Sequence, residues 1–182
     1  MMEIPGICGE KVFLRKMEKQ DTDRIIRWRN SDFVRCHFIY QKPFTREVHE
    51  QWIETMIETG KAVQFIICEV ETGNAVGSVY LRDIDMAHKK AEYGIFIGER
   101  EALGRGYGTE AARLMIQYGF ETLHLHKIML RVLADNTAAR RSYEKAGFHQ
   151  EAYLRDEVYL ENQYKDVILM ARINGEKENE KG

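Results

Sequence analysis

Residue types that mark disulfide-rich, metal-binding and multidomain proteins are scarce in this sequence. The three cysteines (Cys8, Cys36 and Cys68) are odd in number, lie far apart and form no C-x-x-C arrangement, so we expect reduced thiols. The six histidines show no metal-ligand spacing, which predicts that no metal is bound. Two prolines in 182 residues leave no Pro-rich linker, which favours a single domain.

An excess of either charge and long apolar runs are also missing. The 27 basic and 29 acidic side chains give a formal net charge of -2, which gives no global support for a nucleic-acid or anionic-membrane partner. No apolar stretch approaches the roughly 20 residues of a membrane helix. The N-terminus M-M-E-I-P-G has no basic-then-apolar run, so we expect no signal peptide and a cytoplasmic protein.

Hydrophobic periodicity predicts a mixed α/β domain over residues 1–173, followed by a disordered polar tail at 174–182. Strands and helices do not alternate as in a regular βα repeat. The expected strands are Val12–Arg15, Val63–Val70, Ala75–Leu81, Lys90–Gly98, Lys127–Leu133, Glu151–Leu160 and Tyr164–Ile173. The expected helices are Asp21–Asn30, one from Thr45 to Gly60 with Val48, Trp52, Ile53 and Met56 on its apolar face, one after Thr109, and one from Asn136 to Gly147.

A glycine-rich loop, Leu103–Thr109, separates a strand from a helix. Gly104, Gly106 and Gly108 let backbone N–H groups converge on an anion at the positive end of a helix. The dinucleotide-binding pattern G-x-G-x-x-G is not met, because Thr109 stands at its third glycine, and no Lys-Ser/Thr pair follows to make a Walker A loop. The loop therefore predicts a phosphate group without naming its owner.

Two blocks of residues resemble the GNAT superfamily of acetyltransferases. Leu103–Glu110 is similar to the coenzyme A pyrophosphate loop [Q/R]-x-x-G-x-[G/A], although Leu103 replaces Gln or Arg. Leu130-Arg131-Val132 and then Asn136-x-x-Ala139-x-x-x-Tyr143-x-x-x-Gly147-Phe148 are similar to the family's next strand and helix. The resemblance, nearest to ribosomal-protein-alanine, spermidine and nucleotide-amino-sugar acetyltransferases, implies acetyl-CoA as co-substrate. It also implies a central mixed, mostly antiparallel sheet flanked by helices.

The resemblance also implies which residues bind acetyl-CoA. They are the main chains of Ile95, Phe96 and Ile97, the loop residues Leu103, Gly104, Arg105, Gly106, Tyr107, Gly108 and Thr109, and the side chains of Asn136 and Tyr143. Tyr143 is the expected proton donor to the leaving thiolate, with a packed core aromatic as its alternative role. No Ser-His-Asp or Cys-His arrangement can be read from the spacing, so direct transfer without a covalent enzyme intermediate is expected.

An acceptor amine must lose a proton before or during attack, because an amine with a pKa near ~10 is mostly protonated at pH 7. Glu92 is the candidate base. It alternates along its strand with Tyr93, Ile95 and Ile97, so it should face the opposite side of the sheet. Its alternative role is an ion pair with Lys89, Lys90 or Arg131.

The acceptor site should lie in the N-terminal half. Trp28-Arg29-Asn30 and Thr45–Trp52 resemble acetyltransferases that act on nucleotide-linked amino sugars, and Arg29 would suit a phosphate. Trp28 could instead be a core residue. Carboxylates such as Asp83, Asp85 and Glu92 would suit a polyamine. The expected acceptor is a small amine, polyamine or amino sugar. A protein N-terminus or lysine, or a non-catalytic acetyl-CoA-binding module, remains an alternative, and the sequence leaves open whether the chain acts as a monomer or a homodimer.

Overall fold

The computed structural model describes residues 7–176, which form one sheet with helices on both sides. The strands are β1 (Ile7–Cys8), β2 (Val12–Lys16), β3 (Val63–Glu69), β4 (Ala75–Asp85), β5 (Lys90–Ile97), β6 (Lys127–Leu133), β7 (His149–Leu160) and β8 (Gln163–Ile173). The α-helices are α1 (Thr22–Asn30), α2 (Asp32–Arg35), α3 (Arg46–Trp52), α4 (Tyr107–Glu121) and α5 (Thr137–Lys145). Short helical turns lie at Lys19–Asp21, Ile53–Ile57 and Arg100–Ala102.

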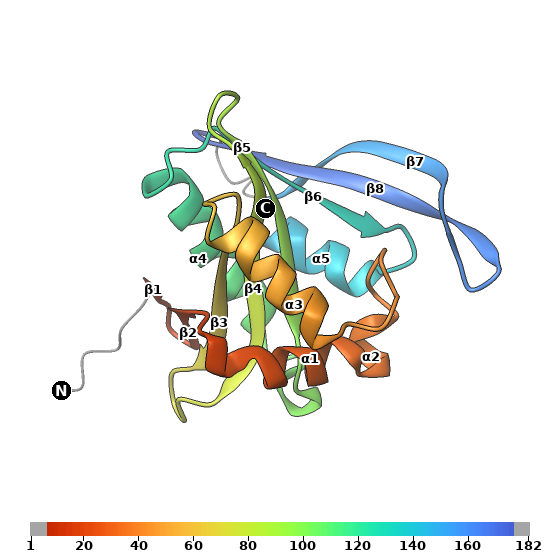
Figure 1. Cartoon of the computed structure of the whole chain (residues 1–182). Helices are drawn as coiled ribbons and strands as arrows, with labels where there is room; N and C mark the ends of the chain where they lie inside the picture. The colour runs from red at the N-terminus through yellow and green to blue at the C-terminus, as the bar shows by residue number, and fades with distance from the viewer. Residues whose placement is uncertain (1–6, 177–182) are drawn as a thin grey trace.

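The eight strands follow the order β1-β2-β3-β4-β5-β6-β8-β7, and all neighbours are antiparallel except β5 and β6. The larger apolar cluster joins one face of this sheet to α4 and α5, while a smaller cluster that includes Trp28 and Phe96 joins the other face to α1. Figure 1 shows α1 and α3 crossing in front of the central strands and the β7–β8 hairpin extending away from the rest. The mixed, mostly antiparallel sheet predicted from the sequence is confirmed.

Strands β5 and β6 separate after a short paired segment. Their pairs are Lys90–Lys127, Ala91–Ile128 and Glu92–Met129, although β5 continues to Ile97 and β6 to Leu133. Beyond Glu92, β5 stays paired with β4 and β6 with β8. We call the gap between residues 93–97 and 130–133 the β5–β6 opening. Backbone groups of β5 that face it have no strand partner, so they are available to a ligand.

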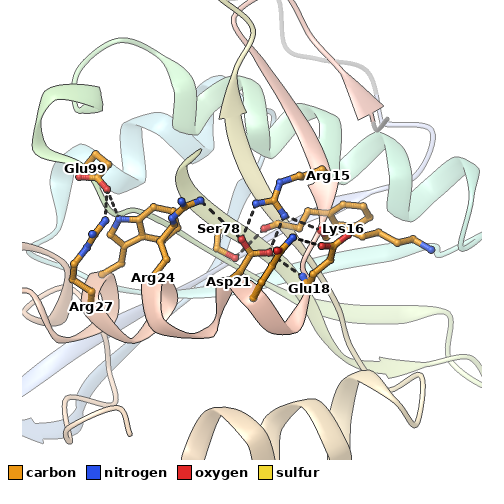
Figure 2. Close-up of polar contacts among 11 residues, drawn as sticks. Arg15, Lys16, Glu18, Asp21, Arg24, Arg27, Ser78 and Glu99 are labelled. Carbon is orange, nitrogen blue, oxygen red and sulfur yellow. Dashed lines mark hydrogen bonds and ion pairs between the residues drawn. The ribbon is translucent and has the colours of Figure 1, made fainter. Parts of the chain in front are cut away.

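Helix α1 is fixed at both ends by carboxylates. The buried Asp21, just before α1, accepts two hydrogen bonds from the Arg15 guanidinium of β2, at 2.8 and 2.7 Å. At the other end, Glu99, in the loop after β5, accepts from Arg27 at 2.8 Å and from Trp28 Nε1 at 2.7 Å. Figure 2 shows the Asp21 and Glu99 contacts at opposite ends of the helix. These contacts fix α1 over the sheet.

The second predicted helix begins where expected, but its buried face differs. The Thr45 side chain caps α3 by accepting from the Val48 N–H at 3.3 Å, and Gly60, with φ of 73°, follows the last turn. Val48, expected on the apolar face, is 42% exposed, and His49 is buried in its place. The reason is that the His49 ring finds a hydroxyl partner in Thr22 on α1 at 3.2 Å, so the helix turns this residue inward.

Two predictions concern residues outside those described. The N-terminal segment read for a signal peptide lies at residues 1–6, and most of the predicted polar tail lies at residues 177–182. Within residues 7–176, no helix is both long enough and apolar enough to span a membrane.

Candidate active site

The glycine loop turns sharply into the N-terminus of α4. Gly104 and Gly106 have φ values of 74° and 83°, a region that residues with a side chain rarely adopt, and Gly106 is the N-cap of α4. The first N–H groups of a helix have no partner inside the helix and point along its axis. The loop and helix therefore form an anion site at the end of β5.

The side chains of the loop serve the fold more than the anion site. Arg105 pairs with Glu69 at 3.0 Å, and Tyr107 is buried in the larger cluster. Glu110, in the first turn of α4, accepts from three backbone N–H groups of the β1–β2 turn, those of Glu10, Lys11 and Val12, at 3.1, 2.8 and 2.7 Å. Binding by this loop therefore rests on its main chain.

Helices α4 and α5 are linked next to the anion site. The Thr109 hydroxyl lies 2.9 Å from that of Ser142. Asn136 caps α5 by accepting from the Ala139 N–H at 3.2 Å, as its position in the sequence predicts. The two helices meet the same face of the sheet, so α5 brings Tyr143 towards the β5–β6 opening.

Tyr143 lies among aromatic rings on the α4–α5 face. Its ring centroid is 6.0 Å from those of Tyr93 and Phe148. Burial, and then the neighbouring Tyr80, raise the pKa of Tyr143, so its hydroxyl keeps its proton at neutral pH. The buried Tyr93 hydroxyl has no hydrogen-bond partner among the described residues. The Tyr143 hydroxyl on this side of the opening is therefore protonated at neutral pH.

Glu92 stands at the last β5–β6 pair, on the opposite face from Tyr93. Its Oε1 accepts from Arg82 at 2.9 Å and from Arg131 at 3.3 Å. No group of the described residues donates to Oε2. The predicted ion pair with Arg131 is present. A second ion pair joins Glu92 to Arg82 instead of to Lys89 or Lys90. The free oxygen leaves room for an N–H of a ligand.

Arg29 is another charged group on the α1–α3 face. Its guanidinium lies 3.4 Å from the centroid of Phe38 and 5.0 Å from that of Phe44, in stacking range of both rings. Its Nη1 is buried without a hydrogen-bond partner among the described residues. Burial lowers the pKa of the guanidinium, because its charge has lost water. The described residues supply no ion-pair partner to this partly buried cation, which leaves it available to an anion.

Trp28 does not fit the predicted role in acceptor binding. It is 1% exposed within the smaller cluster, and its N–H is taken by Glu99. The helix turns Trp28 towards the sheet and leaves Arg29 at the edge of the packed layer. Trp28 is therefore an anchor of α1 and offers no surface to a substrate.

Tyr80 was missed in the sequence. It lies on β4 opposite Gly94, and its ring covers the place where a Gly94 side chain would be. The signal was Gly94 itself, because a glycine inside a strand often marks a close approach. The pairing of β4 with β5, which identifies the approaching residue, could not be read from local sequence.

An open depression of about 270 Å³ lies where the α2–α3 loop, the end of β6 and the β7–β8 turn meet. Its walls include Cys36, His37, Asn136 and Glu161. A second depression of about 510 Å³ lies beside the glycine loop, between Lys11, Arg105 and Glu71. Neither could be predicted, because each joins segments distant in the sequence. Among the described residues, no group of three or more His, Cys, Asp or Glu is arranged to hold a metal ion.

These features fit acetyl-CoA. A helix N-terminus with two glycines at positive φ suits a diphosphate, and the unpaired edge of β5 suits an extended chain with amide groups. The opening lies between Tyr143 on one face and Glu92 on the other, so that proton-carrying groups approach it from both sides. The fold and site define an acyl-CoA-dependent transferase.

Comparisons with known proteins agree with this class. A family model described as "Acetyltransferase (GNAT) domain" matches residues 11–149. A spermidine N(1)-acetyltransferase of Escherichia coli is 31% identical, covering 89% of this chain and 86% of the relative. A putative ribosomal N-acetyltransferase of Bacillus subtilis is 26% identical, covering 95% and 97%. A crystal structure of spermidine N-acetyltransferase from Vibrio cholerae, with CoA and spermine, has a TM-score of 0.83 at 27% identity and covers 91% and 96%.

The chain belongs to the GNAT acetyltransferase family. It is an N-acetyltransferase that uses acetyl-CoA and acetylates an amine by direct transfer.

Proposed function

We propose that this enzyme transfers the acetyl group of acetyl-CoA to the primary amine of a small molecule that enters from the α1–α3 face. The β5–β6 opening carries the proposal, because Tyr143 on one face of the sheet and Glu92 on the other both lie beside it. The donor would bind with its diphosphate at the glycine loop and its thioester in the opening. The acceptor would approach on the Glu92 side.

On the donor side, the residues act mainly through their backbone. The N–H groups of the loop 103–109 would bind the diphosphate, and the main chains of Ile95, Phe96 and Ile97 would pair with the pantetheine arm. The Asn136 side chain, at the N-terminus of α5, would border the same channel. No metal is required for these contacts.

For the transfer, a proton of the ammonium group would pass to Glu92 Oε2, directly or through water. The neutral nitrogen would attack the thioester carbon, and a backbone N–H of β5 would stabilise the oxyanion. The C–N bond then forms, the C–S bond breaks, and Tyr143 gives its proton to the sulfur. The second proton that the nitrogen loses as the amide forms would return to the Tyr143 oxygen, directly or through water, and Glu92 would release its proton to solvent. Exclusion of water raises the pKa of a thiol as well as that of Tyr143, so the leaving thiolate would also be a stronger base in the opening than in water.

The charges on the acceptor side favour an amine that also carries an acidic group, such as a phosphorylated or nucleotide-linked amino sugar. Arg29 offers a partly buried cation whose Nη1 has no hydrogen-bond partner among the described residues. Two of the carboxylates that would suit a polyamine are engaged elsewhere: Asp83 pairs with Arg82 at 3.5 Å and Asp85 with His88 at 2.8 Å. Glu92 keeps Oε2 for the amine, while two arginines hold its Oε1. A polycation would add charge to a wall that is already positive.

The test is release of coenzyme A thiol from acetyl-CoA with a panel of amines in matched pairs. One member of each pair carries a phosphate or carboxylate, and spermidine and lysine- and alanine-terminated peptides complete the panel. We expect acetylation of small amines, with kcat/KM at least tenfold higher for the acidic member of a pair. Preference for peptides would identify a protein acetyltransferase. If no amine in the panel, peptides included, supports thiol release, the proposed acetylation of amines is rejected.

A further inference from the structure

The Tyr80 ring lies across strand β5 at the edge of the β5–β6 opening. A Cβ built on Gly94 would come within 2.3 Å of Cζ and 2.4 Å of the hydroxyl oxygen of Tyr80. The hydroxyl therefore lies over the backbone of Gly94, two residues beyond the last β5–β6 pair at Glu92. Only glycine leaves room for this crossing.

A chain of contacts holds the ring. Trp52 packs edge-on against it, with 5.8 Å between ring centroids. Trp52 Nε1 donates to Gln64 Oε1 at 2.9 Å, and Gln64 Nε2 donates to the Ser78 hydroxyl at 2.9 Å. Both Gln64 and Ser78 are buried. A buried network of this kind fixes the orientation of the aromatic group that it supports.

The hydroxyl at the end of this fixed ring has no hydrogen-bond partner among the described residues. Its charged neighbours are Arg29, Arg82 and Glu92, the groups that border the acceptor side. Tyr80 also contributes to the raised pKa of Tyr143, which lies across the opening. Burial raises the pKa of Tyr80, so the hydroxyl stays neutral and can both donate and accept a hydrogen bond.

We propose that Tyr80 is a catalytic residue whose hydroxyl binds the acceptor amine at the β5–β6 opening. The proposal rests on the proposed function of the site. The hydroxyl oxygen accepts one N–H of the amine, Glu92 receives another proton, and the nitrogen lone pair then points towards the thioester. Tyr80 orients the nucleophile and exchanges no proton.

A purely structural role would leave the hydroxyl unexplained. Phenylalanine would make the same ring contacts with Trp52 and Gly94, so the contacts that hold the ring do not require the hydroxyl. A hydroxyl that these contacts do not require, placed beside the β5–β6 opening, distinguishes Tyr80 from a core aromatic.

The test compares Tyr80→Phe with Tyr118→Phe, which removes the hydroxyl of another partly buried tyrosine that packs on Phe65. We expect Tyr80→Phe to lower kcat/KM for the acceptor by about tenfold or more, the loss of one good hydrogen bond to the substrate. The dissociation constant of acetyl-CoA and the thermal midpoint should stay within error. Tyr118→Phe should change neither kcat/KM for the acceptor nor the dissociation constant of acetyl-CoA.

Gly94→Ala is the second variant, because its methyl group must displace the Tyr80 ring. It should lower kcat/KM for the acceptor at least as much, with acetyl-CoA still bound. Unchanged acceptor kinetics in Tyr80→Phe, or equal losses in Tyr80→Phe and Tyr118→Phe, would overturn the assignment while leaving the proposed function intact. If the unmodified enzyme acetylates no amine, the proposed function and this assignment fail together.

Discussion

Tyr143 and Glu92 approach the β5–β6 opening from opposite faces of the sheet, and their surroundings suit opposite tasks. Tyr143 lies among the rings of Tyr93 and Phe148, where burial keeps its proton in place. Glu92 is partly exposed, with one oxygen held by two arginines and the other open. At the scale of single residues, this arrangement supports the proposal that Tyr143 donates a proton and Glu92 receives one.

Replacing Tyr143 by phenylalanine removes the proposed donor without removing the ring. We expect kcat to fall about 100-fold, the lower end of general acid catalysis. The dissociation constant of acetyl-CoA should change less than twofold, because Tyr93 and Phe148 still hold the ring. Steady-state thiol release and equilibrium binding measure the two quantities. An unchanged kcat would remove Tyr143 from the mechanism.

The raised pKa of Tyr143 predicts the shape of the pH profile. A group with a raised pKa loses its proton at higher pH, so the donor form persists through the alkaline range. The neutral fraction of an amine with a pKa near ~10 grows over the same range. We therefore expect kcat/KM to rise from pH 7 to about pH 9 without a decline. A decline below pH 9 that is absent in Tyr143→Phe would contradict this assignment.

At the scale of elements, the glycine loop allows a matched comparison. Gly104 and Gly73 have φ values of 74° and 73°, and a Cβ at either would meet no atom within 4 Å. Alanine at either position should destabilise the fold by a similar amount, about 1–2 kcal/mol, from backbone strain alone. Only Gly104→Ala should also weaken acetyl-CoA binding, by about tenfold, since it reshapes the anion site. Equal acetyl-CoA affinities of the two variants in calorimetry would contradict binding of acetyl-CoA at the glycine loop.

The ion pair between Asp21 and Arg15, which fixes the start of α1, should contribute to the stability of the fold. Burial opposes the charge of Asp21, but hydrogen bonds from Arg15 and from the Glu18 N–H outweigh it and hold the pKa of Asp21 below its usual value. Asp21→Asn should lower the free energy of unfolding at pH 7 by about 3 kcal/mol, because it leaves Arg15 without its partner.

Because the folded-state pKa of Asp21 is lowered, the stability that its charge contributes is present above pH ~4 and is lost as the pH falls further. The difference between the native protein and Asp21→Asn in urea unfolding should therefore shrink only in acid. A constant difference down to pH 3 would show that packing, and not charge, is responsible.

The periodicity of the sequence predicted most elements because their apolar faces are local patterns. Strand Lys127–Leu133 matches its prediction, and Asn136 caps α5 as its position indicates. The structure differed from the prediction where a contact with a residue distant in the sequence determined which side chain is buried. His49 turned inward because Thr22 lies opposite it, and α2, only four residues long, is too short for periodicity to indicate.

At the scale of the whole molecule, acetyl-CoA should bind across elements that are separate in the sequence: the loop, β5 and α5. A ligand that binds only the folded state stabilises it by about 2.7 kcal/mol at 100 times its dissociation constant. For a domain of this size we expect the thermal midpoint to rise by about 5–10 °C. Gly104→Ala should show a smaller rise at the same concentration. No rise at millimolar acetyl-CoA would contradict donor binding.

The sequence by itself determined the donor class, since the glycine loop and the Asn136–Phe148 block are contiguous segments whose chemistry depends on local backbone and spacing. It also predicted Glu92 and Tyr143 as catalytic residues, and these roles stay predictions. Only the tertiary structure decided where β5 and β6 separate, that Trp28 is an anchor, that Arg29 Nη1 is buried without a hydrogen-bond partner among the described residues, and that Tyr80 crosses Gly94. Each of these depends on the pairing or packing of segments far apart in the chain, which no local pattern encodes.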